Sequence, residues 1–263
     1  MTQTSRRAWV QQIMGMPISI HLRGTASTAL REAAVAAVFA ELREVDRVFS
    51  TYRPDSEVSQ LRAGVLPLEE CTPAVAEVID LCAEASRATG GYFSAWLPGP
   101  DGAVAPPAMA RFDPTGLVKG WAVERAAAHL AELGDDYYVS AGGDIALASR
   151  PDRPPWRVAV EDPHRPSERV AVLAVAAGGV ATSGTAHRGS HIFDPIGGGP
   201  ATALASVTVV GPSLMRADVL ATAACARGAD ALSYLDWPAG YQALVVTADG
   251  ESVHTAGLAA LLA

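Results

Sequence analysis

Residues 156–176 read WRVAVEDPHRPSERVAVLAVA, two runs rich in Val and Ala separated by a polar segment that contains two Pro. Such runs, bounded by turn-forming residues, predict two strands that pair across a turn at residues 162–169. A second hairpin is predicted for residues 241–255, around the Asp249-Gly250 turn. Paired strands mixed with helices favour an α+β fold, with mixed or antiparallel sheets layered with helices, over a doubly wound parallel sheet.

Helices are predicted where apolar residues recur at spacings of three and four. One lies within residues 28–49, and its apolar stripe consists of Leu30, Ala34, Val38, Leu42, Val45 and Phe49. Another begins at Pro73, with Thr72 as its N-cap, and stops at Gly90-Gly91. Further helices are predicted over 118–134 and 215–227, and further strands over 17–22, 137–140, 144–148 and 206–210.

The length of 263 residues suits a single domain over 1–263, with enough chain to bury a large core. Residues 98–110, PGPDGAVAPPAMA, combine Pro and Gly in a way typical of a loop or an insertion. This segment could separate two lobes that share the core. We therefore expect one domain, with a possible division near 98–110.

Composition excludes several classes of function. The formal net charge is -8 and Lys and Arg do not cluster, which argues against a nucleic-acid partner. Three Cys without a C-x-x-C spacing indicate neither a disulfide framework nor a zinc site. The chain shows no signal peptide, no Cys placed for a lipid anchor and no long apolar segment, so we expect a soluble, cytoplasmic protein without a membrane anchor.

Residues 216–228, RADVLATAACARG, contain the first candidate site. Asp218 and Thr222 stand four residues apart on a predicted helix and so share one face. A carboxylate beside a hydroxyl suits Mg²⁺ with a phosphate ligand better than zinc. The alternative is structural: an Asp near a helix N-terminus and a Thr bonded to a backbone carbonyl.

Residues 112–126, FDPTGLVKGWAVERA, contain the second candidate site. A Gly just before a helix, here Gly116, leaves its carbonyl free for a cation, and the helix start with Lys119 favours phosphate oxygens. The spacing is not that of a P-loop. A solvated Lys at an ordinary helix start is the alternative.

The third candidate is the stretch SGTAHRGSHIFDPIGGGPA, residues 183–201. It places Ser183, Ser190, His191 and Asp194 on loop backbone, where functional groups are often presented. A lone His is more often structural than catalytic, and no G-x-S-x-G nucleophile motif is present.

Together these stretches resemble one family. The segments MGMPISIHL, FSTYRPDSEVSQL, FDPTGLVKGWAVERA, VSAGGDIAL, HIFDPIGG and ADVLATAACARG are similar, in this order, to the successive motifs of the FAD:protein FMN transferase (ApbE) family. The resemblance spans nearly the whole chain. It implies an ApbE-like α+β fold and Mg²⁺-dependent transfer of FMN from FAD to a Thr or Ser hydroxyl of a target protein, with release of AMP.

The resemblance also implies roles for individual residues. The FAD site would be lined by Met14, Tyr52, Asp113, Lys119, Ser183 and Ile192. The metal would be held by the Gly116 carbonyl, Asp218 and Thr222. His191 would lie at the reacting centre as the proton-handling group, with Asp218 as the other catalytic residue.

Some positions depart from the family pattern. Met16 stands where the family often has Thr, and the segment after Gly91 reads YFSAWLPG where an FDPTV-like run is common. Two rival functions share the predicted flavin site: an Mg²⁺-dependent FAD pyrophosphatase that yields FMN and AMP, and a non-catalytic FAD-binding protein. The partners expected are FAD and a flavin-acceptor protein whose identity the sequence leaves open.

Overall fold

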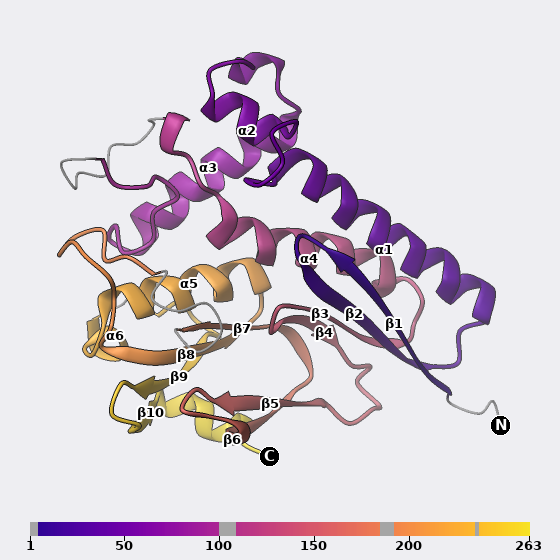
Figure 1. The fold of residues 1–263 in the computed structure, drawn as a ribbon. Coiled ribbons are helices and arrows are strands. Elements are labelled where there is room, and N and C mark those ends of the chain that lie inside the picture. Colours follow the sequence, from indigo (N-terminus) through magenta and orange to yellow (C-terminus); the bar gives the residue numbers. More distant parts are fainter. Residues whose placement is uncertain (1–4, 100–108, 185–191, 235–236) are drawn as a thin grey trace.

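The computed structural model describes residues 5–99, 109–184, 192–234 and 237–263 (Figure 1). Its main sheet follows the order β1-β2-β3-β4-β7-β8-β9-β10, and every neighbouring pair is antiparallel. The strands of this sheet are β1 (Ser5–Ile13), β2 (Met16–Gly24), β3 (Asp136–Ala141), β4 (Asp144–Ala148), β7 (Ala177–Gly184), β8 (Leu204–Gly211), β9 (Gln242–Thr247) and β10 (Ser252–His254). The strands β5 (Trp156–Asp162) and β6 (Arg165–Val175) form a separate hairpin.

Helices cover one face of the main sheet and the β5–β6 hairpin lies on the other side (Figure 1). The α-helices are α1 (Thr28–Phe49), α2 (Glu57–Arg62), α3 (Pro73–Ala88), α4 (Thr115–Ala131), α5 (Leu214–Arg227) and α6 (Ala231–Tyr234). The 3₁₀-helices are η1 (Leu68–Glu70), η2 (Met109–Arg111) and η3 (Ala256–Leu261). The α+β layering expected from the sequence is therefore confirmed.

Two apolar clusters follow from this layering. The larger fills the space between the sheet and helices α1, α3, α4 and α5. The smaller joins the opposite face of the sheet to the β5–β6 hairpin and η3, through residues such as Leu147, Leu173 and Leu258. The division into lobes near 98–110 stays a prediction, because residues 100–108 lie outside the described part of the chain.

The predicted hairpin of residues 156–176 is present, but its turn is tighter than expected. Trp156 pairs with Val175, and Asp162 already pairs with Arg165, so much of the predicted turn belongs to β6. The Asp162 carboxylate explains the tight reversal, because it accepts hydrogen bonds from the His164 backbone N–H (2.9 Å) and the Arg165 guanidinium (2.8 Å). A local side-chain bond of this kind closes a short turn, so both strands extend beyond the ends of their apolar runs.

The helix predictions are confirmed with local corrections. In α1, Val38, Leu42 and Phe49 are buried as expected, but Leu30 is 60% exposed and does not belong to the apolar stripe. Helix α3 begins at Pro73, yet the Thr72 side chain makes no capping bond. The Thr72 backbone N–H donates a hydrogen bond to the Glu57 carboxylate at 2.7 Å.

Two strands escaped the sequence analysis. Strand β1 is exposed along most of its length, and its apolar residues at 8–10 are consecutive, so it has no alternating pattern. It reaches β2 through a turn in which Met14 has φ 53° and Gly15 φ 71°. Strand β7 ends at Ser183 and Gly184, so these residues lie on a strand and not on the loop that we expected. The correction places the Ser183 side chain on a rigid element.

Glycines let three elements approach closely where the candidate site lies. A Cβ on Gly179 of β7 would come within 2.3 Å of the Leu214 Cα, at the start of α5. A Cβ on Gly120 of α4 would lie 3.0 Å from the Met215 Cα. Helix α5 is therefore in near-backbone contact with both β7 and α4.

Within residues 5–99, 109–184, 192–234 and 237–263, no helix combines the length and the apolar character that crossing a bilayer requires. A cytoplasmic location stays a prediction.

Candidate functional site

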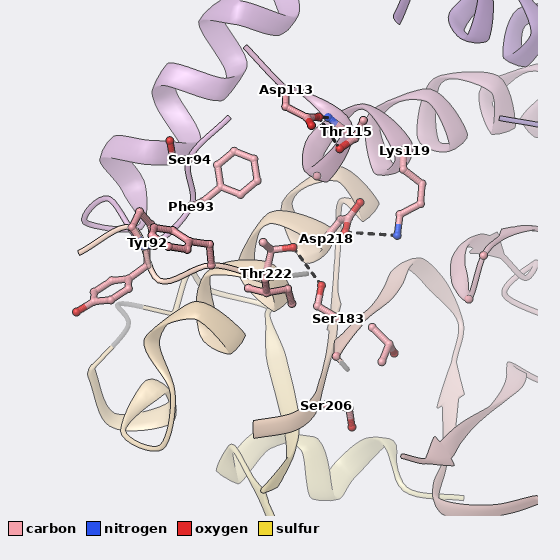
Figure 2. Close-up of a pocket in the computed structure, with 18 of the residues that line it drawn as sticks. Tyr92, Phe93, Ser94, Asp113, Thr115, Lys119, Ser183, Ser206, Asp218 and Thr222 are labelled. Atoms are coloured by element: carbon pink, nitrogen blue, oxygen red, sulfur yellow. Dashed lines mark hydrogen bonds and ion pairs between the residues drawn. The ribbon is translucent and has the colours of Figure 1, made fainter. Parts of the chain in front are cut away.

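A cavity of about 390 Å³ opens where the start of α4, the middle of α5 and the end of β7 meet residues 92–98 (Figure 2). This volume falls within the range of small-molecule sites. The apolar part of the lining comes largely from Tyr92, Phe93, Trp96, Leu97, Ile192 and Phe193. The polar part includes Asp113, Thr115, Lys119, Glu161, Thr182, Ser183, Ser206, Asp218 and Thr222.

Lys119 and Asp218 line the charged end of the cavity, and Lys119 also pairs with the buried carboxylate of Asp144, which is not part of the lining. The Nζ of Lys119 lies 2.7 Å from Asp144 Oδ2 and 3.8 Å from Asp218 Oδ1. The side chains of Asp144 and Asp218 are 0% and 3% exposed. Lys119 is also the only Lys of the chain. When both carboxyls are ionised, two anions face one cation away from water, and this excess of negative charge favours a further cation.

Burial raises the pKa of the Asp218 carboxyl well above its ordinary value, and the nearby Asp144 carboxylate raises it further. Lys119 and the Gly120 N–H act in the opposite direction without cancelling these effects. In the absence of a metal ion, Asp218 therefore holds a proton to higher pH than an ordinary Asp does.

A backbone contact links Asp218 to the start of α4. The Gly120 N–H donates to Asp218 Oδ2 at 3.2 Å. In a regular α-helix this N–H would bond to the Gly116 carbonyl four residues earlier, so the Asp218 carboxylate competes with that carbonyl for the Gly120 N–H. Gly116 lies in the first turn of α4, and not before it as we expected, and it lines the cavity.

Two hydroxyls continue the polar wall. The Oγ of Ser183, at the end of β7, lies 3.1 Å from the Oγ1 of Thr222, one helical turn beyond Asp218 on α5 (Figure 2). The sequence prediction that Asp218 and Thr222 share a helix face directed at one site is thereby consistent with the structure, since both line the cavity.

These donors fit a hard divalent cation. Carboxylate, hydroxyl and carbonyl oxygens are the ligands that Mg²⁺ prefers. Within the described residues, no group of three or more His, Cys, Asp and Glu side chains is placed to hold a metal ion, so hydroxyl and carbonyl oxygens would have to complete the donor set around Asp218. The surplus negative charge of the Asp144–Asp218 pair supplies the electrostatic reason for a cation to bind there.

Other predicted residues fall into two sets. Asp113 and Ile192 line the cavity, and Asp113 Oδ1 accepts hydrogen bonds from the Thr115 N–H and hydroxyl at 3.1 and 2.7 Å. Met14 and Tyr52 are not part of the cavity lining, and Tyr52 is 94% exposed. Their roles at the flavin stay predictions.

The sequence stretch that contains His191 is described only in part. His191 and Ser190 lie outside the described residues, so the role predicted for His191 stays untested. Asp194 does not line the cavity. Its Oδ1 accepts hydrogen bonds from the neighbouring Ile196 and Gly197 N–H groups at 2.9 and 3.0 Å. This carboxylate shapes a turn.

The sequence analysis assigned no role to Asp144. The residue follows the Gly142-Gly143 turn, in which both glycines have positive φ, and begins the otherwise apolar strand β4. A charged residue inside a buried strand was the available signal, since such residues are rarely buried without a partner. Phe93 was also missed, although its ring lies 3.4 Å from where a Gly116 Cβ would stand.

The chain is similar to a known family and to several named proteins. A model of the ApbE family matches residues 14–97 and 101–245. An FAD:protein FMN transferase of Vibrio cholerae serotype O1 is 36% identical over 124 residues, which cover 43% of this chain and 37% of the relative. The Escherichia coli (strain K12) protein of the same name is 34% identical over 148 residues, covering 49% and 42%. The matched stretch thus spans less than half the length of these curated relatives.

Solved structures show the same fold. The ApbE protein of Thermotoga maritima superposes with a TM-score of 0.84 at 20% identity, covering 98% of this chain and 99% of that one. The apo flavinyl transferase ApbE of Pseudomonas stutzeri gives a TM-score of 0.80 at 24% identity, covering 100% and 99%. The arrangement of helices on an antiparallel sheet is therefore shared along the full chain.

Proposed function

The chain belongs to the ApbE family, and from this premise we propose that it transfers FMN from FAD to a Thr or Ser hydroxyl of a target protein, in an Mg²⁺-dependent reaction that releases AMP. The observation that carries the proposal is the buried Asp144–Asp218 pair, which shares Lys119 at one end of a ligand-sized cavity. The names of the curated relatives supply the reaction class.

The cavity offers complementary surfaces for the two parts of FAD. Phe93, Trp96 and Ile192 supply apolar surface for a planar ring system. Lys119 and the N-terminal turn of α4 supply positive charge and N–H donors for a pyrophosphate. Met14, Tyr52 and Ser183 complete the proposed set of flavin-site residues.

The reaction needs a polarised pyrophosphate and an acceptor oxygen in line with it. The acceptor hydroxyl oxygen forms a bond to the phosphorus of the FMN half, the bond from that phosphorus to the bridging oxygen breaks, and AMP leaves with that oxygen. A bound Mg²⁺ supplies neutralisation of the charge on the phosphate oxygens. Asp218, Thr222 and the Gly116 carbonyl are the residues that would hold it.

The chain's own groups handle charge and protons in this scheme. The Lys119 ammonium stabilises the negative charge that develops on the phosphate oxygens of the leaving group. We assign the acceptor proton to His191, as the proton-handling group of the loop that follows β7, with Asp218 as the second candidate base. The proton passes from the acceptor hydroxyl to this base and from there to solvent.

The assay that tests the function follows two products in parallel. FAD and Mg²⁺ are mixed with the protein, with and without an acceptor protein that carries an exposed Thr or Ser motif for flavin attachment. We expect AMP to form together with acceptor-bound flavin, detected by in-gel fluorescence, and both to disappear with EDTA. Tight FAD binding without AMP under any condition would contradict the proposal in favour of a flavin-binding protein, and equal AMP release without acceptor would identify a pyrophosphatase.

A further inference from the structure

Glu124 is a half-buried residue of α4 that reaches across to the first turn of α5. Its Oε2 accepts a hydrogen bond from the Ser213 hydroxyl at 2.8 Å and another from the Met215 N–H at 2.9 Å. Ser213 is also the N-cap of α5, because its Oγ accepts the Arg216 N–H. One carboxylate oxygen of α4 thus holds the N-terminal end of α5.

The face of α4 that makes this contact also faces the candidate metal site. Gly116, Gly120 and Glu124 follow one another at four-residue intervals, so they lie along one side of the helix. Gly120 is in near-backbone contact with α5 and donates its N–H to Asp218. The helices therefore meet at two fixed points: Glu124, near the middle of α4, holds the first turn of α5, and Gly120 lies against Met215 and Asp218. Gly116, in the first turn of α4, lines the cavity.

We propose that Glu124 is a positioning residue for the metal site: it fixes the axial position of α5 against α4, and so sets how far Asp218 and Thr222 lie from the Gly116 carbonyl. The proposal rests on the proposed function, because it concerns the metal ligands assigned there. Glu124 is absent from the residues that line the cavity, so it acts through α5.

The physical reason lies in the rigidity of a helix. Asp218 and Thr222 follow the Met215 anchor by about one and two turns on the same helix, so a slide or tilt at Met215 moves both oxygen donors together. Mg²⁺ demands near-octahedral geometry with ligand distances of about 2.0–2.1 Å. A displacement of a fraction of an ångström at the anchor is therefore enough to weaken binding.

The N-terminal end of α5 has a second anchor that makes the test practicable. The Ser213 N–H donates to the Tyr241 hydroxyl at 3.2 Å, independently of Glu124. Because this bond and the packing of Leu214 against Gly179 persist, we expect variants at position 124 to fold. The variants then report on the geometry of the site.

Three substitutions separate positioning from charge. Glu124→Gln keeps an acceptor oxygen at the same reach and removes the charge. Glu124→Asp keeps the charge but shortens the side chain, and Glu124→Ala removes both. If the position of the acceptor oxygen matters, Glu124→Gln should preserve the affinity for the metal within a few fold. Glu124→Asp and Glu124→Ala should weaken it by roughly 10- to 100-fold, the usual effect of losing a residue that orients a metal ligand.

The measurement is Mn²⁺ binding in the presence of FAD, followed by loss of the free-ion EPR signal and checked by Mg²⁺ competition. The metal-free melting temperature of each variant is recorded beside it. Glu84→Gln is the matched control, because Glu84 contacts α5 through the exposed Arg216 at 3.3 Å and reaches neither Ser213 nor Met215. We expect its affinity for Mn²⁺ to equal that of the wild type.

Each outcome decides the proposal. Lower melting temperatures with unchanged Mn²⁺ affinity would show that Glu124 is only a structural cap. Loss of Mn²⁺ affinity in Glu124→Gln but not in Glu124→Asp would show that the charge of Glu124 acts through space. Both results contradict a positioning role. If the wild type binds Mn²⁺ but transfers no flavin, the proposed function fails while this proposal is still decided by the variants. A wild type that binds neither ion with FAD present contradicts both.

Discussion

Asp218→Asn should abolish AMP release and, at the same time, stabilise the metal-free protein. The Asn keeps the shape of the side chain and an oxygen that can accept the Gly120 N–H, but it removes one of two buried anions. We expect the rate of AMP release to fall at least about 100-fold, since a bound metal contributes several kcal/mol and each 1.36 kcal/mol is a factor of ten.

The stability effect has a definite dependence on pH. In the metal-free wild type the pKa of Asp218 is raised on folding, so its contribution to stability is present below the unfolded value of about 4 and is lost as the pH rises through the folded pKa. Asp218→Asn should remove this loss and raise the Tm at neutral pH by roughly 2–4 °C, the shift that about 1 kcal/mol produces in a chain of this size.

The check is a set of melting curves with EDTA between pH 5 and 8, repeated with saturating Mg²⁺ and FAD. We expect Mg²⁺ to raise the Tm of the wild type but not that of Asp218→Asn. A variant that melts well below the wild type in EDTA, or that keeps its full response to Mg²⁺, would remove Asp218 from the metal site.

Lys119→Met should have the opposite effect on stability. It leaves Asp144 and Asp218 buried without the ammonium that lies 2.7 Å from the first and 3.8 Å from the second. Removing one partner of a buried ion pair costs about 3–5 kcal/mol. At neutral pH this corresponds to a fall in the Tm of roughly 10 °C.

The deficit of Lys119→Met should shrink toward pH 5, because the Asp218 carboxyl, whose pKa is raised by burial and by Asp144, takes up a proton and the repulsion between the two groups falls. The deficit should grow as the pH rises. Arg125→Met is the matched control on the same helix: Arg125 is 47% exposed and pairs with Glu41 and Glu77 at the surface, where an ion pair contributes at most about 1 kcal/mol. A deficit for Lys119→Met that is as small as that of the control, or independent of pH, would show that the buried pair does not depend on Lys119.

The sequence was informative wherever a pattern is local. The spacing of Asp218 and Thr222 on one helix placed both at the cavity, and the FDPTGLVKG stretch placed Gly116 and Lys119 beside them. The β5–β6 hairpin was recognisable because turn residues separate two apolar runs, and the β9–β10 hairpin because Asp249-Gly250 marks its turn. The α+β class followed from these hairpins.

Features that depend on distant parts of the chain were not predictable in this way. Asp144 reaches Lys119 and Asp218 only because β4 lies between β3 and β7 in the sheet. The order of strands in a sheet cannot be predicted from any single segment of the sequence. Strand β1 is an exposed edge strand without apolar alternation, so periodicity could not reveal it. No role could be predicted for Glu124, because its partner Ser213 lies 89 residues away in the sequence and on another helix boundary.

The central claim is that the cavity between α4, α5 and β7 holds FAD and uses its AMP half as the leaving group. Calorimetric titration of the wild type with FAD and with FMN, in the presence of Mg²⁺, tests this most directly. We expect FAD to bind more tightly than FMN, because contacts to the adenylate half add to those of the flavin, and Asp218→Asn to reduce this difference. Equal affinities for FAD and FMN, or a difference that Asp218→Asn leaves unchanged, would contradict it.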